Sequence, residues 1–150
     1  GTCYFGTSTA YQGDYGRGYG IAYFPIGTSD EELACVLHHE AGGHGFAKLL
    51  DEYYYESQGT IPLSEISDNI NSRNHYGWGR NVDYTSDPNS VVWSKFISDS
   101  RYASEGIGVF EGACTYYKGA YRPTETSIMD ANVGGFNAPC VRRFITVSIS

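Results

Sequence analysis

Apolar residues recur at helical spacing in two parts of the chain. The first pattern has intervals of three and four residues and comprises Leu33, Val36, Leu37 and Ala41. This spacing predicts an amphipathic helix over about residues 30–49. Ser29 and Glu32 have the spacing of a capping box, in which each side chain bonds the other residue's backbone N–H, so they mark the start of the helix.

The second pattern lies near the C-terminal end and comprises Val141, Phe144, Ile145 and Ile149. Asn137, followed by Ala138 and Pro139, resembles a helix entry, because proline is tolerated in the first turn. Alternation of Ile145, Val147 and Ile149 fits a strand instead. The sequence leaves both interpretations open.

The rest of the chain is less regular. Residues 20–27, GIAYFPIG, are aromatic and β-branched and predict a strand, which Pro25 restricts to a sheet edge or a strand end. Residues 58–88 are polar without a sustained period and predict a long surface loop with a short helical turn. Residues 87–99 predict a second helix, and residues 106–135 are turn-rich and predict largely non-helical structure.

Length and composition bound the class of protein. A chain of 150 residues forms one domain with a substantial core. The net charge of -7 argues against nucleic acid as the main partner. No apolar run approaches the roughly 20 residues that cross a bilayer. The opening GTCYFGTST has no leader-like character, so we expect the segment to begin inside a larger protein.

The four cysteines give an ambiguous signal. Cys3, Cys35, Cys114 and Cys140 lie far apart and form no C-x-x-C pair, which argues against a structural zinc knuckle. They could form up to two disulfides, as in an exported protein. They could equally be buried thiols, and Cys35 lies inside the first helical pattern.

The strongest chemical signal is His39-Glu40-Ala-Gly-Gly-His44, which has one residue more than the H-E-x-x-H motif of zinc peptidases. At roughly 100° per residue, the two histidines would lie about 140° apart on a regular helix. A π-bulge at Gly42 and Gly43 would bring them together and leave Glu40 as a general base. Otherwise Glu40 and His44, four residues apart, would hold the ion. We predict the bulge.

A third ligand is expected shortly after this helix. Asp51 and Glu52 follow where the helix can have ended, and a carboxylate oxygen is an acceptable zinc ligand at about 2.0–2.2 Å. His38 and His75 are predicted to be ordinary packing or surface residues. The order of strand, turn and histidine-bearing helix is the one that a zincin requires.

Two segments carry a family resemblance: HHEAGGHGFAKLLDEY and EGIGVFEGACTYYKGAYRPTETSIMDANVGGFNAP. Together they resemble the catalytic region of the bacterial IgA-peptidase family of zinc metallopeptidases, which are metzincin-like. The resemblance implies an α+β, metzincin-like catalytic domain over residues 1–150 that lacks its N-terminal part. It also implies protein or peptide substrates and a secreted, periplasmic or bacterial cell-surface location.

By the same resemblance, His39 and His44 are zinc ligands, Glu40 is the general base and Asp51 is the third ligand, with Glu52 as a competitor. The sequence SIMD resembles the Met-turn, in which Met129 would form an apolar floor beneath the metal.

The longer H-E-x-x-x-H form is similar to the motif of the dipeptidyl-peptidase III family. This similarity makes Glu111 another candidate third ligand. In zincins, the edge strand before the active helix pairs with extended substrate, and here YGIAYF has that place. Tyr121 could stabilise the oxyanion of the reaction, although packing is the preferred interpretation.

Two functions follow. The favoured one is a zinc-dependent endopeptidase, in which metal-activated water attacks a peptide carbonyl and Glu40 transfers the proton. The alternative is a non-catalytic module that binds protein or glycan and has a degenerate or structural metal site.

Overall fold

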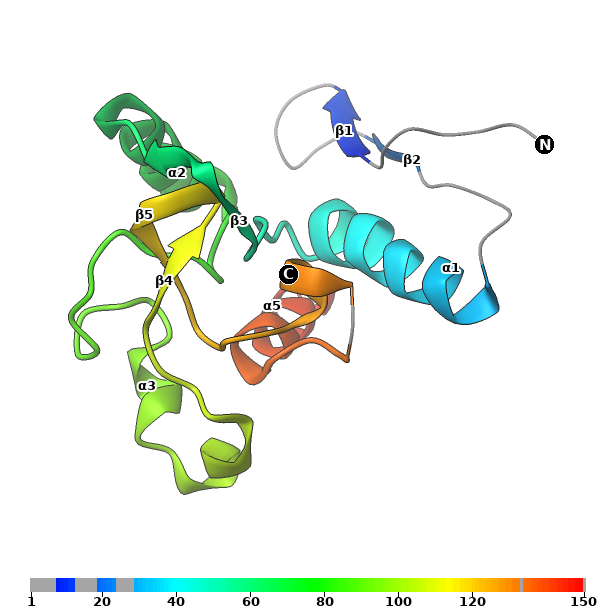
Figure 1. Cartoon of the computed structure of the whole chain (residues 1–150). Coiled ribbons are helices and arrows are strands. Elements are labelled where there is room, and N and C mark those ends of the chain that lie inside the picture. Colours follow the sequence, from blue (N-terminus) through cyan, green and yellow to red (C-terminus); the bar gives the residue numbers. More distant parts are fainter. Residues whose placement is uncertain (1–7, 13–18, 24–28, 133, 150) are drawn as a thin grey trace.

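The computed structural model has an α+β architecture and describes residues 8–12, 19–23, 29–132 and 134–149 (Figure 1). Its elements in chain order are β1 (Ser8–Gln12), β2 (Tyr19–Tyr23), α1 (Asp30–Leu37), η1 (His38–Phe46), β3 (Tyr54–Thr60), α2 (Leu63–Tyr76), α3 (Ser94–Ile97), η2 (Ser100–Glu105), β4 (Phe110–Ala113), β5 (Thr115–Arg122), α4 (Ile128–Ala131) and α5 (Ala138–Ser148).

The helix that carries the histidines begins as predicted. Ser29 Oγ accepts a hydrogen bond from the Glu32 N–H at 3.3 Å, and Glu32 Oε2 accepts one from the Ser29 N–H at 3.2 Å, so the capping box is confirmed. α1 continues directly into the π-helix η1. The predicted end at residue 49 is wrong by three residues, because Lys48 turns the chain with a positive φ of 57°.

The strands form two separate sheets. β1 and β2 pair antiparallel and pack on η1. The other sheet has the order β3-β5-β4, with β3 parallel and β4 antiparallel to β5. The strand predicted at residues 20–27 is found as β2, and residues 24–27 lie outside the described part of the chain.

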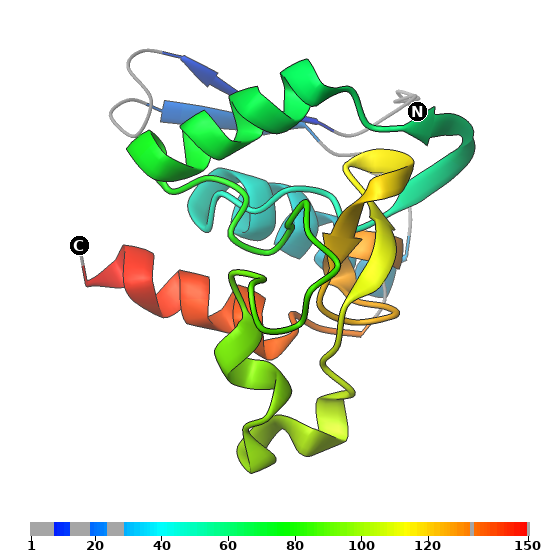
Figure 2. The ribbon, with the colours of Figure 1, turned by 90° about the vertical axis from the view of Figure 1, so that its left-hand side faces the viewer.

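The prediction of a surface loop over residues 58–88 is wrong, since α2 occupies Leu63–Tyr76 (Figure 2). Its partly or fully buried positions do recur at helical spacing, but most carry polar side chains: Glu65, Ile66, Asn69, Ser72 and Arg73. A search for apolar periodicity therefore misses the helix. Gly77 ends it with a φ of 76°, in the left-handed region that favours glycine.

Two further predictions on helices have opposite outcomes. The second helix predicted over residues 87–99 shrinks to the single turn α3, preceded by the buried residues Val91 and Trp93. The C-terminal segment is the helix α5, so the strand interpretation is wrong there. Asn137 caps it by accepting a hydrogen bond from the Cys140 N–H at 3.1 Å.

The predicted apolar face of α5 is only partly correct. Phe144 packs on the core, but Val141, Ile145 and Ile149 are exposed. The inward face is instead formed by Cys140 together with Phe144. In residues 106–135, the expected non-helical structure takes the form of β4 and β5, followed by the short helix α4.

The described residues contain two apolar clusters. One joins the end of η1 to α4 and α5, and it consists of Ala47, Leu49, Ile128, Met129 and Cys140, with Phe136 and Phe144 against it. The other lies under the three-stranded sheet and consists of Ile61, Val82, Ala113 and Ala120, with Leu50 and Ile66 among its neighbours. Since Leu49 belongs to one cluster and Leu50 to the other, Asp51 follows at their junction.

The three cysteines of the described residues are free thiols. Cys35, Cys114 and Cys140 are not disulfide-bonded to one another, so the possibility of two disulfides is excluded, while Cys3 lies outside the described residues. Among the described residues, no helix combines the length and apolar character needed to cross a bilayer.

Candidate metal centre

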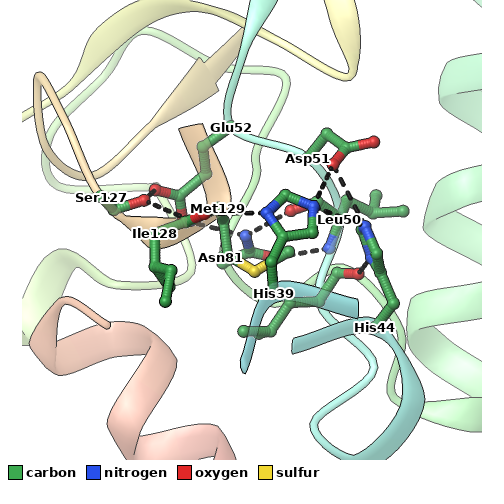
Figure 3. Close-up of polar contacts among 10 residues, drawn as sticks. His39, His44, Leu50, Asp51, Glu52, Asn81, Ser127, Ile128 and Met129 are labelled. Atoms are coloured by element: carbon green, nitrogen blue, oxygen red, sulfur yellow. Dashed lines mark hydrogen bonds and ion pairs between the residues drawn. The ribbon is translucent and has the colours of Figure 1, made fainter. Parts of the chain in front are cut away.

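Three side chains converge, two of them from η1 and the third from the segment that follows it (Figure 3). His39 Nε2 and His44 Nε2 lie 3.1 Å apart, and each lies 3.1 Å from Asp51 Oδ1. The three atoms therefore form a nearly equilateral triangle. Among the described residues, this is the group of His, Cys, Asp or Glu side chains that could hold a metal ion.

The π-helix makes this convergence possible. On an α-helix, residues five apart point in different directions, but a π-helix bonds each N–H to the carbonyl five residues earlier. The Ala47 N–H shows this pattern by donating to Gly42 O at 2.9 Å. His39 and His44 consequently share a face. The predicted widening of the helix at the glycines is confirmed, but it extends over the whole of η1 instead of a single bulge. The alternative prediction, a regular α-helix on which Glu40 and His44 share a face, is wrong.

Backbone carbonyls fix both imidazole rings. His39 Nδ1 lies 2.8 Å from Ile128 O, and His44 Nδ1 lies 2.8 Å from Leu49 O. A carbonyl oxygen can only accept, so both Nδ1 atoms carry hydrogen and each neutral ring presents a lone pair at Nε2. When both rings are neutral, two nitrogen lone pairs and a carboxylate oxygen thus face one another, an arrangement that is repulsive unless a proton or a metal cation lies between them.

The electrostatics of the cluster reflect the same convergence. Burial alone would raise the pKa of Asp51, but hydrogen bonds and charge from His39 and His44 hold it well below its usual range. Burial lowers the pKa of His44, whereas the hydrogen bond and charge of Asp51 outweigh this effect and raise it above its usual value. Asp51 is therefore an ionised carboxylate that favours positive charge beside it.

The position of Asp51 depends on Asn81, which the sequence did not single out. The fully buried amide of Asn81 accepts from the Leu50 N–H at 3.0 Å and donates to Leu50 O at 2.8 Å. It thus pairs with the backbone of Leu50 as a neighbouring strand would. This contact fixes the residue directly before Asp51.

Glu52 is not in the triangle. It is fully buried and accepts hydrogen bonds from Ser127 Oγ at 2.6 Å and Asn81 Nδ2 at 2.9 Å (Figure 3). Asn137 Nδ2 donates a third hydrogen bond at 3.1 Å. Cys140 Sγ lies 3.3 Å from the same carboxylate. Burial raises the pKa of Glu52. Its carboxylate holds the surrounding loops together instead of competing for an ion.

Glu111 also lies outside the group. It is an exposed residue of β4, and its carboxylate accepts from the Gly119 N–H at 3.1 Å and from the Tyr121 hydroxyl at 3.5 Å. Tyr121 pairs through its backbone with Asp83. The structure thus places Tyr121 in the sheet, away from the three converging side chains, in agreement with the preferred packing interpretation.

A cavity of about 630 Å³ opens onto the triangle. Its lining comprises His39, Glu40, His44, Asp51, Tyr53, Tyr54, Tyr55, Trp78, Asp130, Ala131 and Asn132. Glu40 is 3% exposed, and its negative charge contributes to the raised pKa of His44. The predicted base and the three predicted ligands therefore face one cavity. The aromatic residues of its wall are additions that the sequence did not identify.

Tyr53, one of these wall residues, interacts directly with Asp51. Burial, together with the charge of Asp51 and a hydrogen bond to it, raises the pKa of Tyr53. The hydroxyl accordingly keeps its proton beside the carboxylate. The chain has 14 tyrosines, so residue type alone does not single out Tyr53. Its position directly after Asp51 and Glu52 is the one feature of the sequence that could have identified it as a site residue. His38 and His75, in contrast, are exposed, as predicted for ordinary surface residues.

Met129 lies under the π-helix. It is fully buried in the cluster with Ala47 and Leu49, and the Met129 carbonyl accepts from the Glu52 N–H at 2.8 Å. A Cβ added at Gly43 would overlap the Met129 Sδ and approach its Cε to 3.0 Å. The absence of a side chain at residue 43 therefore allows η1 to lie directly on Met129.

This contact makes a paired prediction. Gly43→Ala should lower the free energy of unfolding by about 1–3 kcal/mol, because overpacking forces either Met129 or the helix to shift. Gly42→Ala is the control, since its Cβ would meet Phe144 and Phe136 at ordinary distances of 3.6 and 3.7 Å. Urea denaturation of both variants measures the difference, and equal stabilities would show that the Gly43 contact does not matter.

No protein-family model matches this chain, and no curated protein matches it. The resemblance to the IgA-peptidase family thus rests on the sequence segments that carry it and stays a prediction. The same holds for the extent of the catalytic domain over residues 1–150.

Proposed function

We propose that this chain is the catalytic part of a zinc-dependent endopeptidase of metzincin-like type. The observation that carries the proposal is the convergence of two Nε2 lone pairs and one ionised carboxylate oxygen within 3.1 Å of one another. The segment Ser127–Met129 beneath the histidines supports the metzincin comparison, because Ile128 O orients His39 and Met129 packs against η1.

The spacing favours zinc. A tetrahedral ion with bonds of about 2.0–2.1 Å separates its ligand atoms by about 3.3–3.4 Å. The observed 3.1 Å separations are within a few tenths of an ångström of that value. Two imidazoles and one carboxylate are also a donor set that zinc accepts, and three protein ligands leave one position for water, as in catalytic sites.

The chain's own groups then account for the proton transfers. When bound, zinc supplies a Lewis acid that lowers the pKa of a water molecule to about 7. Glu40 accepts the proton of the attacking water and donates it to the leaving amine. The Nδ1 bonds to Ile128 O and Leu49 O hold the two rings in place throughout. Asp51 balances the positive charge of the centre.

The aromatic wall of the cavity suits a peptide substrate. Tyr54, Tyr55 and Trp78 offer flat apolar surfaces with polar tips beside the reacting centre. By resemblance to the IgA-peptidase family, the proposed substrates are extracellular or surface proteins. The family name alone does not select one of them.

The test is a cleavage assay with denatured protein substrates, followed by mass spectrometry of the products. The chain should cleave when loaded with zinc, lose activity with a chelator and regain it with added zinc. Zinc binding without cleavage of any substrate would favour the alternative of a non-catalytic module with a structural metal site.

A pair of histidine substitutions tests the ligand set. His44→Ala should weaken zinc binding by more than the roughly 10–100-fold that follows loss of an outer hydrogen-bond partner, because it removes a direct ligand. His38→Ala should leave the affinity unchanged, since His38 is exposed and outside the triangle. Competition titration against a chromophoric chelator measures both. Equal affinities would remove His44 from the proposed ligands.

A further inference from the structure

A second cavity, of about 730 Å³, lies between the C-terminal end of α2, the segment from α3 to η2, and α5. Figure 2 shows α5 between the other two. Six of the chain's ten lysine and arginine residues line this cavity: Arg73, Arg80, Lys95, Arg101, Arg142 and Arg143. The only acid in the lining is Asp99. This concentration of positive charge occurs in a chain with a net charge of -7.

Most of these charges lack an acidic partner. Arg101 pairs with Asp99 at 2.6 Å, and Arg73 pairs with Asp83 at 3.3 Å. The other four cations form no ion pair with any acid of the described residues. The cavity therefore has a surplus of positive charge that the described fold does not neutralise.

Two of the cations repel each other. Arg143 Nε donates to Ala47 O at 3.2 Å, which fixes its guanidinium, and its Nη2 lies against Gly77. Burial and the positive charge of Arg80 lower the pKa of Arg143. Like charges held close together in a partly buried site cost free energy. An anion bound between Arg80 and Arg143 would attract both guanidinium groups and offset their mutual repulsion.

Arg73 contributes a further positive charge to the wall of the cavity. It is 8% exposed and lines the same cavity, and its Nη1 and Nη2 bond Asp83 and Val82 O. Its Nε is buried and has no hydrogen-bond partner among the described residues. The Nε is shielded from solvent, so a ligand in the cavity would meet the positive charge of the Arg73 guanidinium and not this N–H.

We propose that this cavity is a binding site for a multiply charged oxyanion, namely a small molecule that carries phosphate or sulfate groups. Arginine forks match the geometry of such groups, and several unpaired cations suit a ligand with more than one negative charge. A volume of about 730 Å³ is ample for a small molecule. The lining shares no residue with that of the metal cavity, so this proposal does not depend on the peptidase function.

Isothermal titration calorimetry in about 0.15 M sodium chloride tests the proposal. The probes are inorganic phosphate, inorganic sulfate, pyrophosphate and a sulfated disaccharide, and the tightest of them distinguishes phosphate from sulfate sources. The variant is Arg80→Gln with Arg142→Gln. Both side chains are exposed, and neither makes a hydrogen bond or ion pair with another described residue, so their replacement spares the fold. Lys118→Gln, an exposed lysine on β5, is the matched control.

We expect saturable binding of at least one probe, weakened about tenfold or more in the double variant and unchanged in Lys118→Gln. Absence of saturable binding for every probe would overturn the proposal. So would equal affinities of the double variant and the unaltered chain. Binding of an oligonucleotide without binding of the small probes would likewise overturn it, in favour of a nucleic-acid surface.

Discussion

Glu40→Gln is expected to lower kcat for peptide hydrolysis by about 10²–10⁴-fold, because glutamine keeps the shape of the side chain but cannot accept a proton. Zinc affinity should change little, since the proposed ligands are His39, His44 and Asp51. Steady-state kinetics with a peptide substrate measure the rate, and metal analysis of the same sample measures the bound zinc.

The zinc content serves as the control for folding of this variant. A Glu40→Gln protein that binds zinc and retains the rate of the unaltered chain would rule Glu40 out as the general base. A variant that loses both zinc and activity would instead identify Glu40 as a group that the metal centre needs for its structure.

Glu52→Ala is expected to lower the free energy of unfolding by about 3–5 kcal/mol. The substitution leaves the buried donors of Asn81, Ser127 and Asn137 without their acceptor, and each such group costs about 1–3 kcal/mol. Urea denaturation of the zinc-free protein measures the change without a contribution from the metal.

Glu56→Ala is the matched control, because Glu56 is exposed on β3, and its substitution should change stability by no more than about 0.5 kcal/mol. A loss below about 1 kcal/mol for Glu52→Ala would mean that water replaces the missing oxygens, and that the network does not hold the loops together.

The segment that carries the candidate metal ligands could be predicted from the sequence because its determinants are local. The capping box of Ser29 and Glu32, the five-residue spacing of the histidines and the paired glycines all lie within sixteen residues of one another. The extra residue required a wider helix, and the glycines showed where it could form. The full length of the π-helix was not predicted. It is accompanied by close packing of Gly43 on Met129, a contact between residues that are distant in the sequence.

α2 could not be predicted by the same means. The contacts of its inner face are polar and distant in sequence, such as the Tyr116 hydroxyl bonded to Glu65 at 2.7 Å and the Arg73 pair with Asp83. From the sequence alone, Glu65 and Arg73 would be assigned to the solvent-exposed face of a helix, because their partners Tyr116 and Asp83 belong to other segments of the chain. The network of Glu52 was missed for the same reason, since Asn81 and Ser127 lie 29 and 75 residues away.

Leu49 and Leu50 anchor the chain in different apolar clusters, directly before Asp51. An ion held by Asp51 and the two histidines would consequently cross-link the parts of the chain that pack in these two clusters. Local unfolding of either cluster would displace a ligand. The ion would therefore be released when the first of the two clusters unfolds, before the rest of the chain does.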